Sequence, residues 1–503
     1  MNGLLSYRSV LLTFLASVAV ALLTGSLLVL AAVPVLMLLV TGLIKPSFIF
    51  FLLLFTIPLS TEYQFSTTLG TDIPDEALMW LLTPMIIFML IRNREVPEAL
   101  LQNKIMVVLL VSLYWTLITV LLSGSPFISL KFLLAKIWYI VPFVLGALLF
   151  LRERKDHLLA GNLVLIPMLF TVIVILLRHG LEGFSFESVN DVTVPFFRNH
   201  VNYGALLVCM IPVAWGLYKA GYKFWLVGLI ILLAGLFFSY SRGAWLALGA
   251  ALIVVYFIWK NALQWLIGIA VVSVILVTAW FIDDNRYLKY RPQFEKTIYH
   301  ASFDEHMAAT YKMQDMSTVE RFYRWIAAVN MAREEPITGS GPNSFYPMYK
   351  SYVANDFRTY VSDNPEKSTV HNYFLLLLTE QGVPGLVLFT VLYIMMLMTA
   401  QKIYHISTDR HTKGLMLVIG AVLGMIGVLI FLSDLIETDK IGSVFYLCAG
   451  ALLDRKIDRS LYLDLTSRAS LRPFPNKLKL NTSIIMARPG TMASMGLFVI
   501  MKL

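Results

Sequence analysis

A histidine and four arginines stand where chemistry at a membrane boundary would need them. His371, Arg198 and Arg242 lie at or just before the start of apolar stretches, and Arg321 and Arg324 are three residues apart in a polar segment. A neutral imidazole can take a proton from a hydroxyl group. Guanidinium groups are suited to bidentate binding of phosphate. The set predicts a reaction in which one base activates an alcohol while arginines hold a phosphorylated partner.

Polar neighbours accompany these residues. Asn372 follows the histidine and Ser241 precedes Arg242, while Asn199, His200 and Asn202 follow Arg198. We predict that these polar side chains support the site. A second interpretation stays open, in which the histidine caps a helix and the arginines reach the lipid headgroups or pair with nearby acids.

Carboxylates offer a rival, metal-dependent chemistry. Asp72, Asp75 and Glu76 form one acidic cluster, and Asp283 and Asp284 form another. A divalent cation held by such groups could replace the arginines. The acids have no fixed ligand spacing, however, and a solvated loop is the favoured explanation of them. Neither a metal pattern nor a disulfide is indicated by the remaining histidines and the two cysteines, which are His200, His300, His306, Cys209 and Cys448.

Composition places these groups in a membrane protein. Of the 503 residues, 58% are hydrophobic and 14% are charged, and the mean hydropathy is +0.74. Soluble domains carry about 25% charged residues. The net charge of +9 is explained by the Lys and Arg bias that orients membrane helices. We therefore expect an all-α, polytopic helix bundle and no nucleic-acid partner.

The apolar stretches predict roughly fourteen spans, or about twelve without the weakest. Their expected positions are 9–24, 26–44, 46–60, 76–91, 104–122, 131–150, 158–177, 200–218, 222–239, 243–259, 262–281, 371–399, 414–433 and 440–453. Loops rich in Lys and Arg alternate with loops that are poor in them. This alternation predicts that both termini are cytoplasmic.

Four parts follow from this pattern. Residues 1–281 and 371–453 form the two portions of the transmembrane bundle, residues 282–370 form a large loop or lid on the outer face, and residues 454–503 form a basic cytoplasmic tail. In the loop, a capping-box pattern at Ser317–Glu320 predicts a helix that reaches Glu335, before Pro336. A glycine-rich tight turn is expected at 338–343.

Three motifs in this order resemble the O-antigen ligase and polymerase superfamily. They are Ser-Arg-Gly-Ala at 241–244, the Arg321–Trp325 helix that runs into Pro-Ile-Thr-Gly-Ser-Gly-Pro at 336–342, and His371-Asn372-x9-Gly382-x-x-Gly385. The start of the span at 199–202 is similar too. The resemblance covers about residues 190–400.

The resemblance implies a GT-C-like fold and an inverting, metal-independent glycosyltransferase without a cofactor. Members use a glycan donor linked to undecaprenyl diphosphate, at the periplasmic side of the bacterial inner membrane. Carried across, His371 would activate the acceptor and the diphosphate would bind Arg242 and Arg321, with Arg198 and Arg324. The glycines would be close-packing positions on the helix.

Three functions fit the residues to different degrees. A ligase would transfer the glycan to lipid A-core in lipopolysaccharide biosynthesis, and a polymerase would extend another lipid-linked repeat. The complete His-Asn-x9-Gly-x-x-Gly run favours the ligase. A transporter of lipid-linked oligosaccharides would need charged groups at the middle of its spans. The predicted spans carry few, so the enzyme is favoured.

Overall fold

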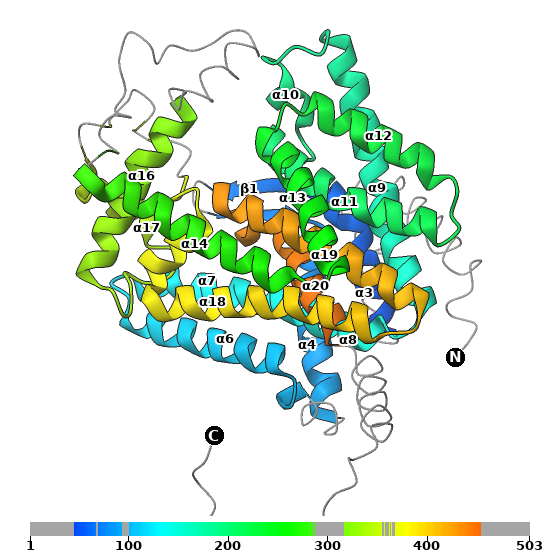
Figure 1. Ribbon diagram of the computed structural model, residues 1–503, viewed down its shortest axis with the longest axis horizontal. Helices are drawn as coiled ribbons and strands as arrows, with labels where there is room; N and C mark the ends of the chain where they lie inside the picture. Colours follow the sequence, from blue (N-terminus) through cyan, green and yellow to red (C-terminus); the bar gives the residue numbers. More distant parts are fainter. Residues whose placement is uncertain are drawn as a thin grey trace, which may run out of the picture. The chain divides into compact units, whose positions relative to one another are not determined.

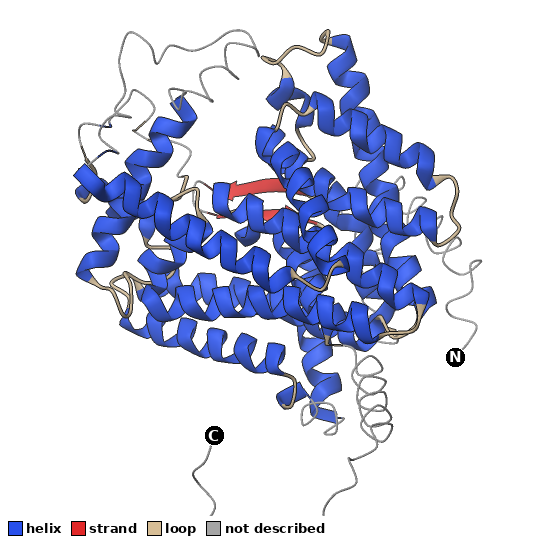
Figure 2. Cartoon of the chain, in the orientation of Figure 1, coloured by secondary structure: helices blue, strands red, loops and turns tan. Residues whose placement is uncertain are grey.

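The computed structural model describes residues 45–66, 69–92, 100–284, 286, 316–354, 357, 362, 364 and 368–453, and it is almost entirely helical (Figures 1 and 2). All of these residues belong to one compact unit that ends at Leu461. Up to residue 193 the elements are α3 (Pro46–Thr56), η1 (Ile57–Leu59), β1 (Thr61–Ser66), β2 (Leu69–Ile73), α4 (Asp75–Arg92), α6 (Lys104–Leu122), α7 (Pro126–Ile140), the π-helical turn η2 (Val141–Leu145), α8 (Gly146–Phe150), α9 (Arg154–Leu181) and α10 (Val189–Thr193).

The remaining elements contain most of the predicted site. They are α11 (His200–Lys219), α12 (Trp225–Phe238), α13 (Arg242–Trp259), α14 (Leu263–Ile282), α16 (Met316–Glu334), α17 (Phe345–Met348), η4 (Tyr349–Ser351), α18 (Tyr373–Ile406), α19 (Arg410–Leu432), η6 (Leu435–Glu437) and α20 (Asp439–Leu452). The predicted helix of the 282–370 segment is therefore confirmed as α16, which ends before Pro336.

The all-α membrane fold is confirmed. Among the described residues, eight helices are long and apolar enough to cross a membrane: α6, α7 with its continuation to Phe150, α9, α11, α13, α14, α18 and α19. Every predicted span from residue 46 onward coincides with a helix, whereas 9–24 and 26–44 lie outside the described residues. A helix satisfies its own backbone hydrogen bonds, as a lipid environment requires.

Two apolar helices differ in length and in burial. Helix α20, predicted as a span at 440–453, has only 14 residues and almost all of them are buried inside the bundle. At about 1.5 Å per residue it is too short to cross a membrane. Helix α14 is long enough to span, and nearly all of its side chains face outward from the bundle.

A two-stranded hairpin stands where only a loop was expected. Strands β1 and β2 pair antiparallel, with Thr61 opposite Ile73 and Tyr63 opposite Thr71. The alternation of Thr61, Tyr63 and Phe65 with polar residues is typical of a strand. The hairpin leads directly into α4. Asp72 of β2 and Asp75 of α4 lie near Asp439 at the start of α20.

Helix α18 is not one straight span. Gly382 has a φ of 67° and a ψ of −171°, which interrupts the helix. The Tyr373 and Phe389 rings lie 4.8 Å apart between centroids, although a straight helix would separate these positions by about 24 Å. The break therefore divides α18 into a short arm (373–381) that folds back along a long arm (383–406). The expected span at 371–399 is corrected accordingly.

Candidate active site

The backbone at His371 is held in an unusual conformation. Its φ is +57°, in the left-handed region that side chains other than glycine seldom adopt. Asn372 follows as the N-cap of α18, where its Oδ1 accepts a hydrogen bond from Leu375 N at 3.0 Å. Its amide Nδ2 donates to the Phe431 carbonyl at 3.0 Å. Asn372 thus fixes the start of the short arm, and with it His371, to the end of α19.

Other elements meet α19 at the same end. Helix α13 packs along α19, and a Cβ added to Gly243 would lie 3.3 Å from Leu432 Cδ1. The Trp325 ring of α16 lies 6.4 Å from the Phe431 ring. Asn372 binds Phe431 as well. The elements that carry Arg242, Arg321 and His371 therefore surround residues 431–434.

Arginine charge acts directly on the histidine. The pKa of His371 is lowered to about 3, first by burial and then by the nearby guanidinium groups of Arg324 and Arg321. Its imidazole is therefore neutral at physiological pH and has a free lone pair for a proton. The predicted base and two of the predicted arginines are thus brought together.

Arg324 is buried and held from two directions. Its Nη1 donates to the Thr369 carbonyl at 3.3 Å, and its Nη2 lies 3.6 Å from Glu320 Oε2. Glu320 in turn accepts a hydrogen bond from Ser362 Oγ at 2.6 Å. A buried guanidinium with this support is oriented before any ligand arrives, which lowers the cost of binding an anion.

Asp434 belongs to the same group, although the sequence motifs did not single it out. Thr369 Oγ1 donates to its carboxylate. Burial raises the pKa of Asp434, and the hydrogen bond from Thr369 and the charge of Arg324 oppose that rise. The acidic composition of 433–440 was visible in the sequence, but only the fold shows that Asp434 lies beside Arg324.

Arg242 occupies the first turn of α13 and is half-buried. Tyr240 has a φ of +52°, and its hydroxyl donates to the Phe184 carbonyl at 2.7 Å. Ser241 is buried against Gly204 of α11, where an added Cβ would lie 2.6 Å from Ser241 Cβ. These contacts fix where α13 begins, and they therefore fix the position of the Arg242 backbone.

Gly382 of the third motif attaches the 282–370 segment to α18. A Cβ at Gly382 would lie 2.0 Å from the Ile337 carbonyl oxygen. The break at this position frees Val383 N to donate to the Pro336 carbonyl at 2.8 Å. Gly382 is therefore a close-packing position, as predicted, but at a helix break rather than within a regular helix.

The short arm of α18 binds the glycine-rich turn at 338–343 through both its backbone and the side chain of Glu380. Gly341 N donates to the Glu380 carbonyl at 3.0 Å. The carboxylate of Glu380 accepts hydrogen bonds from Asn343 N at 2.8 Å and Phe345 N at 3.0 Å. Gly339 and Gly341 have φ values of +67° and +99°, so the predicted glycine-rich turn is confirmed. This turn and His371 are thus carried by opposite ends of one short helix.

The order of these features can now be compared with known families. Residues 227–390 match the family model described as O-antigen ligase. The resemblance found in the sequence is confirmed over this segment. Arg242, Arg321, Arg324, His371, Gly382 and Gly385 all lie within the matched range. No curated protein matches the chain.

The motif around Arg198 lies before the segment that matches the O-antigen ligase family. Asn199 caps α11, with its Oδ1 accepting hydrogen bonds from Val201 N at 3.1 Å and Asn202 N at 3.0 Å. The His200 Nδ1 lies 2.7 Å from Asn190 Oδ1. Arg198 is exposed. The contacts of Asn199 and His200 therefore build the start of α11, and a direct role for Arg198 with a donor stays a prediction.

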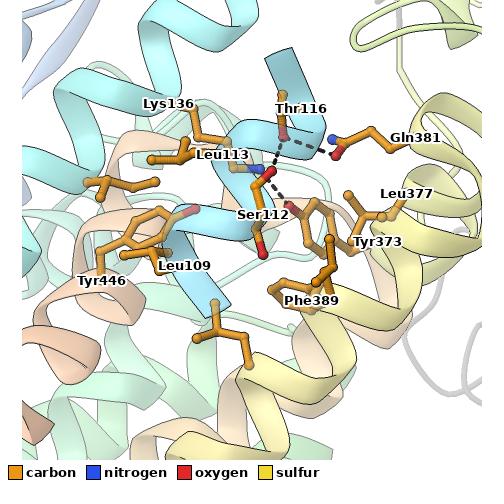
Figure 3. A pocket seen from close by; sticks show the side chains of 14 residues that line it. Leu109, Ser112, Leu113, Thr116, Lys136, Tyr373, Leu377, Gln381, Phe389 and Tyr446 are labelled. Atoms are coloured by element: carbon orange, nitrogen blue, oxygen red, sulfur yellow. Dashed lines mark hydrogen bonds between the residues drawn. The ribbon is translucent and has the colours of Figure 1, made fainter. Parts of the chain in front are cut away.

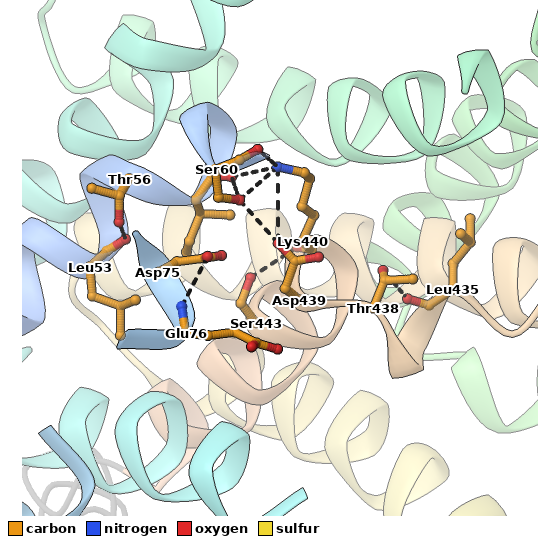
Figure 4. A network of polar contacts seen from close by, with 11 residues as sticks. Leu53, Thr56, Ser60, Asp75, Glu76, Leu435, Thr438, Asp439, Lys440 and Ser443 are labelled. Atoms are coloured by element: carbon orange, nitrogen blue, oxygen red, sulfur yellow. Dashed lines mark hydrogen bonds and ion pairs between the residues drawn. The ribbon is translucent and has the colours of Figure 1, made fainter. Parts of the chain in front are cut away.

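The first acidic cluster lies near Lys440, a lysine of the chain itself (Figure 4). Lys440 Nζ donates to the carbonyls of Ile57 at 3.0 Å and Ser60 at 2.9 Å, and to Ser60 Oγ at 2.8 Å. Its ammonium group also lies 4.0 Å from Asp439. Lys440 therefore takes the position that a bound cation would occupy among these oxygens.

The other acids do not assemble a metal site within the described residues. In those ranges no group of three His, Cys, Asp or Glu side chains has a suitable arrangement. Asp283 forms an ion pair with Arg286 at 2.8 Å. His300 and His306 lie outside the described residues.

Proposed function

We propose that this membrane enzyme is an O-antigen ligase that transfers a glycan from undecaprenyl diphosphate to an acceptor hydroxyl, such as one on lipid A-core. The family match supports an enzyme of the O-antigen ligase or polymerase kind. The observation that carries the proposal is a neutral imidazole next to two guanidinium groups, His371 beside Arg321 and Arg324. In this proposal the site faces the periplasm of a bacterial inner membrane.

The transfer needs no redox partner. The acceptor oxygen forms a bond to the anomeric carbon of the donor sugar while the bond from that carbon to the diphosphate oxygen breaks. The proton of the acceptor passes to His371, and the electron pair leaves with the diphosphate. Attack opposite the leaving group inverts the anomeric carbon. Arginines that meet the developing negative charge can supply several kcal/mol of transition-state stabilisation.

Donor binding also prepares the base. In the free protein, two nearby cations lower the pKa of His371. A bound diphosphate would offset those charges, so the proton affinity of His371 would rise when the donor is present. The base would then be strongest in the complex that uses it.

The proposal is tested with the full chain in lipid nanodiscs, undecaprenyl diphosphate oligosaccharide and lipid A-core. We expect transfer to be lost in His371→Ala and reduced at least about 100-fold in Arg321→Ala. The exposed Lys402 and Arg410, changed to alanine, serve as controls with normal transfer. Normal turnover in His371→Ala would exclude this mechanism, and loss of wild-type turnover with a chelator would require a metal.

A polymerase is the second candidate, since the matched family model also fits that activity. Analysis of the products separates the two. A ligase gives an acceptor that carries a single transferred glycan, whereas a polymerase gives a ladder of lengthening lipid-linked chains. A ladder without any capped lipid A-core would replace the ligase proposal.

A further inference from the structure

Trp325 carries a buried hydrogen-bond donor that the chain itself does not use. The Nε1 atom of its indole ring is buried, and no acceptor lies within hydrogen-bonding distance of it among the residues that the structure describes. A buried indole N–H usually has a partner, because a donor removed from water without one costs free energy. Trp325 belongs to the second sequence motif, and the reaction at His371 gives it no role.

The position of Trp325 decides what its N–H can meet. A buried tryptophan elsewhere shows the usual arrangement, since Trp225 Nε1 donates to Asn162 Oδ1 at 2.8 Å. Trp138 is the other described tryptophan with a buried and unpaired indole N–H. Its ring packs 5.3 Å from that of Trp80 in α4, an element that carries none of the predicted arginines. Trp325, in contrast, lies on the helix that carries two of them.

The short arm of α18 has one side that is satisfied by α6 and α7 (Figure 3). Tyr373 and Gln381 point to this side. Lys136 Nζ donates to the Tyr373 hydroxyl at 3.2 Å, and Thr116 Oγ1 donates to Gln381 Oε1 at 3.1 Å. These polar groups bind one another across a small recess, and Trp325 belongs to a different side of the arm.

Helix α16 covers that other side. It packs along α18, and Thr379 Oγ1 of the short arm donates to the Ala328 carbonyl at 3.2 Å. Arg321, Trp325 and Ala328 are four and three residues apart, so they lie on one face of α16. This face therefore runs from Thr379, near one end of the arm, to Arg321, which lies near His371 at the other end. Trp325 stands between them.

The Trp325 ring reaches the end of α19 to which the base is attached. Its centroid lies 6.4 Å from that of the Phe431 ring, with an interplanar angle of 65°. The Phe431 carbonyl accepts the hydrogen bond of Asn372, the neighbour of His371. Along α16, Trp325 is about 6 Å from Arg321, which is roughly one helical turn. A diphosphate group is long enough to meet both side chains.

We propose that the indole N–H of Trp325 donates a hydrogen bond to a diphosphate oxygen of the donor, next to Arg321. This inference rests on the proposed function. A phosphate oxygen is a strong acceptor, and a hydrogen bond to a charged group is roughly twice as strong as one between neutral groups. The indole adds affinity for the diphosphate without adding charge, whereas another cation at this position would lower the proton affinity of His371.

The test replaces the N–H of Trp325 by sulfur, through incorporation of β-(3-benzothienyl)alanine at this position of the full chain. The ring keeps its shape and loses only its donor. Binding of undecaprenyl diphosphate is measured in nanodiscs. We expect it to weaken about 10- to 100-fold. The melting temperature of the free protein should stay level or rise, because a buried donor without a partner is removed.

The same replacement at Trp225 is the matched control. It deletes the hydrogen bond to Asn162, so the melting temperature should fall while the binding of undecaprenyl diphosphate is unchanged. The two positions should therefore give opposite patterns, which a purely structural role for Trp325 cannot produce. Trp325→Phe and Trp225→Phe repeat the comparison of binding with natural amino acids.

The outcomes separate this inference from the proposed function. Equal binding by the wild type and both Trp325 variants overturns the inference while the proposed function stands. A lower melting temperature for the benzothienyl replacement at Trp325 overturns it too, because the N–H would then have a partner within the chain. A loss of binding that is seen with undecaprenyl diphosphate oligosaccharide, but not with undecaprenyl diphosphate, moves the contact to a sugar oxygen and overturns the diphosphate assignment. If the wild-type protein does not bind undecaprenyl diphosphate at all, the proposed function itself fails.

Discussion

The side-chain amide of Asn372 donates to the main-chain carbonyl of Phe431 at 3.0 Å, while its oxygen caps α18. This one side chain joins the residue after the proposed base to the helix end around which the arginines gather. Asn372→Ala removes both bonds, and loss of an N-cap alone costs about 1 kcal/mol. We expect kcat to fall roughly 10- to 100-fold with little change in KM, because the base is misplaced while the donor site remains.

Asn372→Asp separates the two roles of this residue. Aspartate keeps the capping oxygen but replaces the amide donor by a second oxygen, which faces the Phe431 carbonyl. Steady-state kinetics should therefore show a loss close to that of Asn372→Ala. Wild-type kcat in the aspartate variant would show that the bond to α19 is dispensable.

Gly382 should tolerate no side chain. Gly382→Ala would need a φ of 67° and would place Cβ 2.0 Å from the Ile337 oxygen. Glycine is almost the only residue that adopts this backbone region, and a side chain there costs of order 1–3 kcal/mol. Relief of the clash would separate the 336–341 turn from α18. Thermal unfolding and limited proteolysis of the 282–370 segment should both show destabilisation.

The matched control for Gly382 is Gly249 in α13. An added Cβ there meets no atom within 4 Å, so Gly249→Ala should be neutral or slightly stabilising. Equal melting temperatures for the two variants would contradict the role assigned to the helix break.

The sequence predicted the helices and the His371, Arg321 and Arg324 group because their signals are local. Long apolar runs identify spans, and an ionisable group such as His371 at the end of a run stands out against lipid. The spacing of Arg321 and Arg324 places both on one face of a helix. Gly382 was predicted to be a close-packing position. The break that it makes in α18 depends on the approach of the Ile337 carbonyl, which is 45 residues away along the chain. No periodicity in the sequence reports such a contact.

The remaining surprises come from tertiary contacts of polar groups. Asp434, Glu380 and Lys440 read as ordinary loop or helix residues in the sequence, yet each binds an element far away along the chain. The β1–β2 hairpin could have been inferred from the alternation in 61–66. The contact of Ser60, just before β1, with the start of α20 could not, because it joins residues 380 positions apart.

The lowered pKa of His371 predicts two different acid limits for the reaction. The profile of kcat/KM reports the free enzyme, so it should not fall until the pH approaches about 3. The profile of kcat reports the donor complex, in which bound diphosphate offsets Arg321 and Arg324 and raises the pKa of His371. Its acid limb should therefore lie at higher pH.

Arg324→Gln checks the cause of this shift. Removing the largest charge effect on His371 should raise its pKa, and the acid limb of kcat/KM should move toward neutral pH. Exposed Arg410, changed to glutamine, should leave the limb in place. A wild-type limb near pH 6.5 in kcat/KM would mean that the arginines do not act on the free histidine.

The acids beside Lys440 predict weaker folding at alkaline pH. Burial and then the nearby Asp439 raise the pKa of Asp75 to about 9 and that of Asp72 to about 7. Each folded-state pKa is above the unfolded value of about 3.9. Their contribution to stability is therefore complete at acid pH and is lost as pH rises through about 7 and then about 9. The melting temperature should fall between pH 6 and pH 10, and Asp75→Asn should remove part of that fall.

Asp409 supplies a control of opposite sign. Its pKa is lowered by hydrogen bonds from Thr412 at the start of α19. The contribution of Asp409 is therefore lost only as pH falls toward acid values, and Asp409→Asn should shift the melting temperature by a constant amount across pH 6–10. A wild-type melting temperature that stays level over this range would show that Asp75 folds in its charged form.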